Sequence, residues 1–192
     1  MKSVIQEVMD GIDQARLNED GVSGTPTGFK ALDALTGGWQ NSDMVVLAAR
    51  PGMGKTAFVF SMARNKAVDH GEPVSNFSLE MSSAQLVQRL VAAESELSSE
   101  KFRKGDLQDY EYQQLQTRIA KLTKAQLFID DTPALSVFEL RAKCRRLKQK
   151  HGINMIIIDY LQLMTAGSDN SKGNREQAVS YTHLTLPTMD SV

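Results

Sequence analysis

Ala49-Arg50-Pro51-Gly52-Met53-Gly54-Lys55-Thr56 is the stretch that decides the fold. An apolar run, residues 44–48, precedes it and predicts a strand, while residues 57–60 after it can begin a helix. A strand, a glycine-rich turn ending in Gly-Lys-Thr and a helix are together typical of the phosphate-binding loop of nucleoside triphosphatases. Ala49 stands where the strict pattern has glycine, and the alternative interpretation is an ordinary glycine-rich turn.

The chemistry of phosphate binding explains the residue types in residues 49–56. Gly52 and Gly54 let the backbone curl so that several N–H groups point inward at a β-phosphate. The N-terminus of the following helix adds positive partial charge. Lys55 can reach the β- and γ-phosphates, and the Thr56 hydroxyl can coordinate Mg²⁺. The motif therefore predicts a site for a nucleoside triphosphate and its Mg²⁺ ion.

Two acidic residues complete the predicted site. Asp159 ends the apolar strand of residues 155–158, and a carboxylate at this end of a parallel strand lies beside the phosphate loop of an open α/β sheet. Asp159 can hold the Mg²⁺ shell there, or it can be a plain strand end. Glu80 ends another strand and can orient or deprotonate the attacking water. The alternative for Glu80 is a solvated carboxylate near a helix start.

Strands and helices alternate along the chain. The predicted strands are residues 44–49, 74–79, 127–129 and 154–159. Two capping boxes, Ser82 with Gln85 and Ser136 with Glu139, predict helix starts. This alternation predicts an α/β fold with a mainly parallel sheet. Helical spacing of apolar residues predicts two more helices, one from Val4, Ile5, Val8, Met9 and Ile12 and one from Tyr112, Leu115, Ile119 and Leu122.

Composition excludes several classes of protein. The 192 residues fit one domain, or one domain with an appendage, and the net charge of −1 neither requires nor excludes a nucleic-acid partner. The single cysteine, Cys144, excludes an internal disulfide and a cysteine-based zinc site. The sequence shows no signal peptide and no apolar run of membrane-spanning length, so we expect a cytoplasmic protein without membrane contact.

Six segments carry a more specific pattern. They are Thr27-Gly28-Phe29-Lys30-Ala31-Leu32-Asp33, Thr36-Gly37-Gly38, residues 48–56, Phe77-Ser78-Leu79-Glu80-Met81, Asp159-Tyr160-Leu161-Gln162-Leu163-Met164 and Asn174-Arg175-Glu176-Gln177. These segments closely resemble the ATPase domain of replicative DNA helicases of the DnaB type, over about residues 4–180. The segment after Asp159 is the most specific, because related ATPases share the apolar strand and its aspartate but usually not the residues that follow.

The resemblance implies a RecA-like P-loop NTPase core that uses ATP and Mg²⁺. It implies that Lys55 and Thr56 bind phosphate and Mg²⁺, that Glu80 activates water and that Asp159 completes the metal site. It also implies a homo-hexameric ring that encircles single-stranded DNA at a replication fork and unwinds duplex DNA 5′ to 3′. Primase and a helicase loader are the implied protein partners, through segments that we expect to lie outside this sequence.

We expect three parts along the chain: a junction helix at residues 1–20, a partial RecA-like ATPase core at 21–179 and a tail at 180–192 that departs from the family. The core is expected to be C-terminally incomplete, because the arginine finger and DNA-binding loops of the family lie further on. This chain alone is therefore not expected to unwind DNA. The tail is a poor helix former that resembles foreign read-through, or alternatively a short strand.

A cluster of cations lies on the helix predicted after Ser136. Leu140, Cys144 and Leu147 form an apolar face, so we expect the cations to line the solvated side rather than to contact DNA. The cluster consists of Arg141, Lys143, Arg145, Arg146, Lys148 and Lys150.

Two other functions stay open. One is a module that binds ATP without hydrolysing it. The other is a recombinase-like or clock-type RecA ATPase, against which the residues after Asp159 argue. Hydrolysis measured with and without single-stranded DNA separates the helicase from the binding module.

Overall fold

The computed structural model describes residues 1, 5–6, 9 and 22–165, except for the side chains of Ser99 and Arg103. The described residues divide into two compact units, with the boundary between Ala48 and Ala49, and each is described by itself. Among the described residues, no helix combines the length and the apolar content that a membrane crossing requires.

In the first unit, a short helix is anchored by one buried carboxylate. Helix α2 spans Lys30–Thr36 and is capped by Gly37, whose φ of 67° is left-handed. The Asp33 carboxylate accepts hydrogen bonds from the N–H and hydroxyl of Thr27, over 2.8 and 2.7 Å, and from the N–H of Gly28 over 3.1 Å. A buried charge requires such partners, so Asp33 fixes the turn that precedes its own helix.

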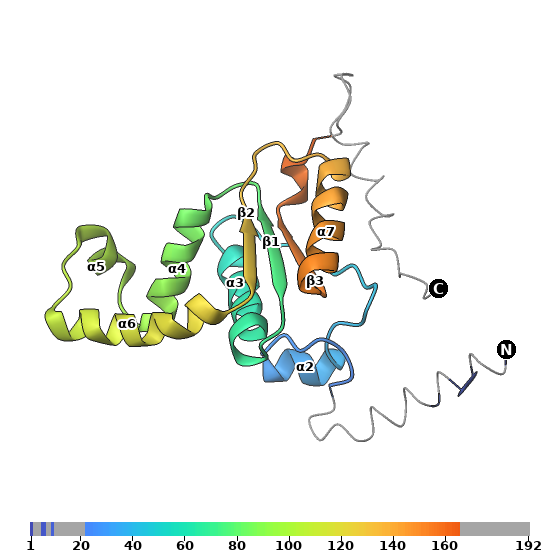
Figure 1. The fold of residues 1–192 in the computed structure, drawn as a ribbon, viewed down its shortest axis with the longest axis horizontal. Helices are drawn as coiled ribbons and strands as arrows, with labels where there is room; N and C mark the ends of the chain where they lie inside the picture. Colours follow the sequence, from blue (N-terminus) through green and yellow to red (C-terminus); the bar gives the residue numbers. More distant parts are fainter. Residues whose placement is uncertain (2–4, 7–8, 10–21, 166–192) are drawn as a thin grey trace. The chain divides into compact units, whose positions relative to one another are not determined.

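The second unit is built on three parallel strands (Figure 1). They are β1 (Val74–Ser78), β2 (Leu127–Asp130) and β3 (Met155–Asp159), in the order β2-β1-β3. Strand β1 pairs with both neighbours, from Val74 opposite Leu127 and Met155 to Ser78 opposite Asp159. The predicted α/β architecture with a parallel sheet is confirmed.

Helices connect the strands. Helix α3 (Lys55–Arg64) and its π-helical continuation η1 (Asn65–Asp69) precede β1. Three helices connect β1 to β2: α4 (Ser83–Ser95), α5 (Ser99–Lys104) and α6 (Asp109–Lys124). Helix α7 (Val137–His151) connects β2 to β3, and the 3₁₀ helix η2 (Leu161–Leu163) follows β3. Both predicted capping boxes form, at Ser82 before α4 and at Ser136 before α7. Helix α5 is not among the predicted elements.

Different helices cover the two faces of the sheet (Figure 1). Successive residues of a strand point to opposite faces. Val74 and Ile157 pack against α3 on one face, and α4 packs beside α3 on that side. Phe128 points to the other face, where its ring lies 4.3 Å from the ring of His151 in α7. The start of α3 and the end of β3 therefore meet on the face that α7 does not cover.

Two side chains on the helices that flank the sheet are buried. Phe60 on α3 is 5% exposed and Cys144, on the predicted apolar face of α7, is 3% exposed. Burial raises the pKa of the Cys144 thiol to about 12, with the charge of Asp130 adding to the effect. The side chain therefore stays a neutral thiol and packs as a small apolar group.

The strand predicted at residues 44–49 is wrong for this structure. Residues 43–50 form neither helix nor strand, and their apolar side chains are exposed, from 44% for Leu47 to 67% for Val46. A strand that is apolar on both faces is stable only with paired neighbours and cover on each face. Strand β3 pairs with β1 alone among the described strands, and no described strand pairs with residues 44–49.

Several predictions concern residues that the structure does not describe. Of the predicted N-terminal helix, only Ile5, Gln6 and Met9 beyond the first residue are described, and these three are helical. The segment at residues 174–177 and the tail at residues 180–192 lie outside the described residues.

Candidate nucleotide-binding site

The phosphate-binding motif forms a turn directly before helix α3. Gly52 and Gly54 have φ values of 79° and 85°, in the left-handed region that favours glycine. The Met53 N–H donates to the Arg50 carbonyl over 3.2 Å. Gly54 is the N-cap residue of α3 and has no side chain that could accept hydrogen bonds from the first N–H groups of the helix. The first N–H groups of α3 are therefore available to an anion at the turn.

Lys55 and Thr56 begin α3 and meet Asp159 at the end of β3. The Lys55 Nζ lies 2.6 Å from Asp159 Oδ1, and the Thr56 hydroxyl donates to Asp159 Oδ2 over 2.9 Å. The Asp159 side chain is 7% exposed and the Lys55 side chain is 26% exposed. A cation, a hydroxyl and a carboxylate from distant parts of the sequence thus form one cluster at the carboxyl edge of the sheet.

The oxygens of Thr56 and Asp159 fit the ligand preference of Mg²⁺. This ion takes hard oxygen ligands, and proteins usually supply one or two of them while phosphates and water supply the rest. In the described part of the chain, no group of three or more His, Cys, Asp or Glu side chains could hold a metal ion. Thr56 and Asp159 would supply two oxygens to such an ion, with phosphate and water oxygens supplying the rest.

Tyr160 gives Lys55 a second partner. The Lys55 Nζ lies 4.5 Å from the centroid of the Tyr160 ring, within the range of a cation–π contact. The ammonium group is thus held between a carboxylate and an aromatic ring that adjoin in the sequence. The two contacts fix the position of a flexible lysine side chain.

Glu80 lies in the turn after β1, at the same edge of the sheet. Ser78 is opposite Asp159 in the strand register, and the Leu79 N–H donates to the Asp159 carbonyl over 2.8 Å. Glu80 follows with an exposed side chain that makes no hydrogen bond or ion pair within the described residues. The structure therefore brings Glu80 to the edge that carries Asp159 but connects it directly to no other predicted site residue.

Ser78 fixes the turn that carries Glu80. Its hydroxyl donates to the Met81 carbonyl over 2.7 Å and accepts from the Met81 N–H over 3.2 Å. Neither Ser78 nor Tyr160 is among the site residues that the sequence predicts. Two signals could have found them: a small hydroxyl residue two positions before an acidic candidate, and an aromatic residue directly after Asp159.

Comparison with known sequences identifies the family of this chain. The profile of the DnaB-like helicase C terminal domain matches residues 24–190. The chain is 44% identical to the replicative DNA helicase DnaC of Bacillus subtilis (strain 168) over 180 residues, which cover 94% of this chain and 39% of the relative. It is also 44% identical to the replicative DNA helicase DnaB of Geobacillus stearothermophilus over 189 residues, 98% of this chain and 41% of the relative.

Solved structures agree with the sequence comparison. One ATPase domain superimposes with a TM-score of 0.84 at 28% identity, covering 93% of this chain and 63% of that chain. A DnaB-like replicative helicase, solved in a study of its interactions with primase, gives 0.79 at 29% identity and covers 92% of this chain and 42% of that chain. The RecA-like core expected from the sequence is thereby confirmed, and this chain spans about two fifths of the two curated relatives. The chain belongs to the DnaB-like helicase C-terminal domain family.

Proposed function

We propose that this chain is the ATP-binding and ATP-hydrolysing part of a replicative DNA helicase that works in the cytoplasm. The observation that carries the proposal is the cluster of Lys55, Thr56 and Asp159 behind a phosphate-binding turn. The relatives named as replicative DNA helicases support it, because their similarity to this chain extends across the site.

In this proposal, residues 49–56 bind the phosphates of ATP. Lys55 neutralises phosphate charge, and the oxygens of Thr56 and Asp159 hold Mg²⁺ directly or through water. When bound, Mg²⁺ offsets the charge that develops on the phosphate oxygens. Lys55 keeps donors for a phosphate beside its contact with Asp159, and the Thr56 hydroxyl releases the same carboxylate to face an ion. The contacts among Lys55, Thr56 and Asp159 hold the three side chains next to the phosphate-binding turn.

We propose Glu80 as the residue that activates the attacking water. A carboxylate accepts a proton well, and the exposed side chain of Glu80 is accessible to water. The hydrogen bonds of Ser78 to Met81 support this role, because they hold the turn in a fixed conformation at the edge that carries Asp159.

The wider assembly is also a proposal. We propose residues 1–20 as a junction helix, 21–179 as the ATPase core and 180–192 as a tail that departs from the family. The full-length protein forms a homo-hexameric ring on single-stranded DNA at a replication fork and moves 5′ to 3′, with primase and a loader as partners. A relative whose structure was solved in a study of its interactions with primase supports the primase partner.

A second function is a nucleotide-binding module without hydrolysis. The observation that favours it is the lack of any contact between Glu80 and the other predicted site residues within the described chain. Hydrolysis requires a base in reach of the attacking water, whereas binding requires only the turn, Lys55 and the metal ligands.

The test compares Glu80→Gln with Asp159→Asn. Glu80→Gln keeps the size of the side chain but cannot accept a proton, so the affinity for a fluorescent ATP analogue stays and turnover by the full-length protein stops. Asp159→Asn instead raises the Mg²⁺ concentration required for binding. Equal loss of affinity and turnover in Glu80→Gln would assign Glu80 a structural or metal-binding role. Turnover with and without single-stranded DNA decides between hydrolysis and binding alone.

A further inference from the structure

Two consecutive acidic residues at the carboxyl end of β2 contact different helices. Asp130 pairs with Lys143 on α7 over 2.6 Å. The next residue, Asp131, is exposed and accepts a hydrogen bond over 2.7 Å from the N–H of Ser83, the first residue of α4. Asp131 thus joins the end of one strand to the helix that follows another. Because β2 runs parallel to β1 and beside it, this contact lies at the sheet edge that carries Glu80.

The contact of Asp131 holds the far side of the turn that carries Glu80. Ser78, at the end of β1, holds the near side through its two hydrogen bonds to Met81. Ser83 lies only three residues after Glu80 and is held by Asp131. The turn is therefore tied to β1 on one side and to β2 on the other, and the two contacts together fix the backbone position of Glu80.

Capping of the helix alone does not account for Asp131. Ser82 and Gln85 already bond to each other in the capping box at the start of α4. Helix α7 begins with the same kind of box, formed by Ser136 and Glu139. Within the described chain, no carboxylate from another element bonds to the start of α7. The additional carboxylate is therefore found at the helix that directly follows the turn of the proposed site.

The charge of Asp131 suits its position. The hydrogen bond from the Ser83 backbone, with a smaller contribution from the Ser83 side chain, holds the pKa of Asp131 below its usual value of 3.8. The carboxylate is therefore ionised at neutral pH, and it faces the positive N-terminal end of α4, where negative charge is favourable. Such a charge-assisted hydrogen bond is stronger than one between neutral groups.

We propose that Asp131 is a positioning residue for ATP hydrolysis, which holds the start of α4 so that Glu80 stays within reach of the attacking water. This inference rests on the proposed function and deepens it, since Asp131 acts through Glu80. A general base works only within hydrogen-bond reach of the proton that it accepts, and a displacement of about 1 Å can cost about 100-fold in rate. Nucleotide binding does not depend on this contact, because it uses the phosphate-binding turn and Lys55.

The test measures ATP turnover and nucleotide affinity for two variants of Asp131 in the full-length protein. We expect Asp131→Ala to lower kcat about 10- to 100-fold, while the affinity for a fluorescent Mg²⁺–ATP analogue stays unchanged. Asp131→Asn keeps an oxygen that can accept the hydrogen bond from Ser83, so we expect this variant to retain most of the turnover.

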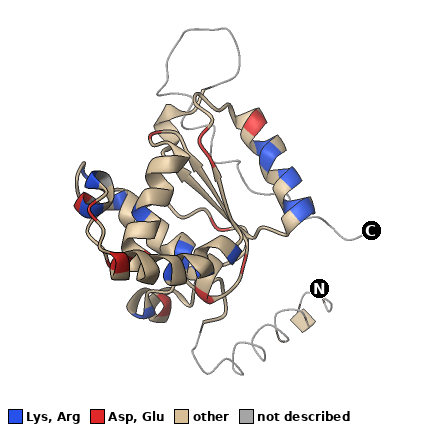
Figure 2. Cartoon of the chain, turned by 60° about the vertical axis from the view of Figure 1, so that its left-hand side comes forward, with Lys and Arg blue, Asp and Glu red and all other residues tan. Residues whose placement is uncertain are grey.

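Glu139→Ala is the matched control. Glu139 is also a carboxylate that bonds at a helix start, where it accepts from the N–H and the hydroxyl of Ser136 over 3.0 and 2.8 Å. Helix α7 has one acidic residue near its start, followed by cations, and it carries no predicted site residue (Figure 2). We expect Glu139→Ala and Asp131→Ala to lower the thermal unfolding midpoint by similar amounts, since each removes a bond at a helix start. We expect only Asp131→Ala to lower kcat.

A double-mutant cycle with Glu80→Gln separates positioning from an independent role. If Asp131 acts through Glu80, adding Asp131→Ala to Glu80→Gln causes no further loss of the residual turnover, because the carboxylate to be positioned is already gone. Amide hydrogen exchange gives a second measurement that does not depend on turnover. We expect faster exchange at residues 80–83 in Asp131→Ala than in Glu139→Ala.

Three results would overturn this inference while the proposed function stands, each with a wild-type protein that hydrolyses ATP. The first is an unchanged kcat in Asp131→Ala. The second is an equal fall of kcat in Glu139→Ala, which would make the effect one of stability. The third is a multiplicative loss when Asp131→Ala is added to Glu80→Gln, which would make the two residues independent. A wild-type protein that binds ATP without hydrolysing it would instead overturn the proposed hydrolysis, and this inference with it.

Discussion

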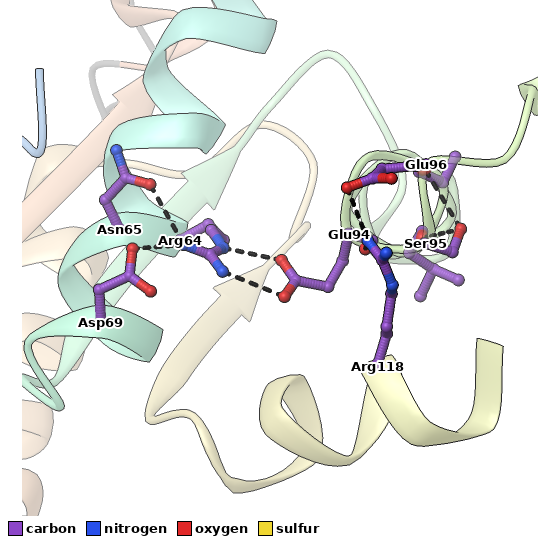
Figure 3. A network of polar contacts seen from close by, with 9 residues as sticks. Arg64, Asn65, Asp69, Glu94, Ser95, Glu96 and Arg118 are labelled. Atoms are coloured by element: carbon purple, nitrogen blue, oxygen red, sulfur yellow. Dashed lines mark hydrogen bonds and ion pairs between the residues drawn. The ribbon is translucent and has the colours of Figure 1, made fainter. Parts of the chain in front are cut away.

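Helix α3 carries an ion pair at each end, and the two pairs are similarly buried but differ in how many partners the cation has. At the first turn, Lys55 contacts Asp159 over 2.6 Å and the ring of Tyr160. At the last turn, Arg64 donates two hydrogen bonds to Glu94 on α4, over 2.8 and 3.0 Å (Figure 3). One helix is thus held to the sheet at its start and to a neighbouring helix at its end.

The Arg64 end is a closed network. Arg64 also pairs with Asp69 and lies 3.5 Å from the Asn65 amide oxygen, so several of its donors have acceptors within the protein. Arg118 on α6 extends the network by donating to the Glu94 carbonyl over 3.1 Å and pairing with Glu96 (Figure 3). A planar guanidinium with this many partners is fixed in one geometry.

The Lys55 end is open by comparison. An ammonium has three donors, and one carboxylate and one ring leave part of that capacity for a phosphate. Similar distances can therefore have different consequences: we propose that the contacts at the start of α3 are exchanged for a ligand, and those at its end hold the helix in place.

The largest expected effect is at the open end. Lys55→Ala removes the cation that the turn itself cannot replace, which costs on the order of several kcal/mol of phosphate stabilisation. We expect the affinity for a fluorescent Mg²⁺–ATP analogue and the turnover of the full-length protein both to be lost. Lys104→Ala, which removes an exposed lysine of α5, is the control. Normal turnover in Lys55→Ala would show that the turn is not the active site.

The next effect is at the closed end and concerns stability. Arg64→Ala leaves Glu94, whose side chain is 13% exposed, without its cation. Breaking a fully buried pair costs about 3–5 kcal/mol, and partial exposure here reduces the expected loss to about 2 kcal/mol. We expect a lower urea midpoint with unchanged affinity for the ATP analogue. Arg89→Ala on α4 is the matched control, and the comparison fails if Arg64→Ala impairs nucleotide binding without loss of stability.

Acid titration gives a smaller effect at the same end. The hydrogen bonds from Arg64, together with its charge, hold the pKa of Glu94 below the usual value of 4.5. A depressed pKa in the folded state stabilises the fold above the unfolded-state pKa, and this stability is lost as pH falls through the folded-state pKa. We expect the urea midpoint of the wild type to drop more between pH 7 and pH 3 than that of Glu94→Gln. Parallel curves for the two proteins would contradict this assignment.

Much of the open end could be predicted from the sequence, because local patterns encode it. The glycine-rich turn predicts Lys55 and Thr56, and an apolar strand ending in an acid predicts Asp159. Parallel strands bring their carboxyl ends to one edge, so the meeting of these residues follows from the fold class. The position of Tyr160 under Lys55 does not follow, since it depends on the direction of the chain after β3.

The closed end could not be predicted in this way. Arg64 and Glu94 are 30 residues apart, on helices whose packing angle no sequence pattern specifies. The strand predicted at residues 44–49 shows the opposite error, because its apolar pattern is strong but no strand of the described chain pairs with it. A local apolar pattern predicts a strand, but the strand forms only where a neighbouring strand pairs with it.

The smallest expected effect comes from an ion pair that is exposed to solvent, unlike the pairs at the two ends of α3. Lys104 and Glu100 on α5 lie 2.6 Å apart with side chains 64% and 63% exposed. Water screens such a pair, and holding two long side chains in one geometry costs entropy, so an exposed i, i+4 pair contributes only about 0.3–0.5 kcal/mol. We therefore expect Glu100→Gln to shift the free energy of unfolding by no more than about 0.5 kcal/mol, with the shift vanishing at about 1 M salt. The contradicting result would be a loss of unfolding free energy as large as that of Arg64→Ala, measured by urea unfolding under the same conditions. Burial and shared partners would then not set the strength of ion pairs in this chain. The distinction between the two ends of α3 would lose its physical basis.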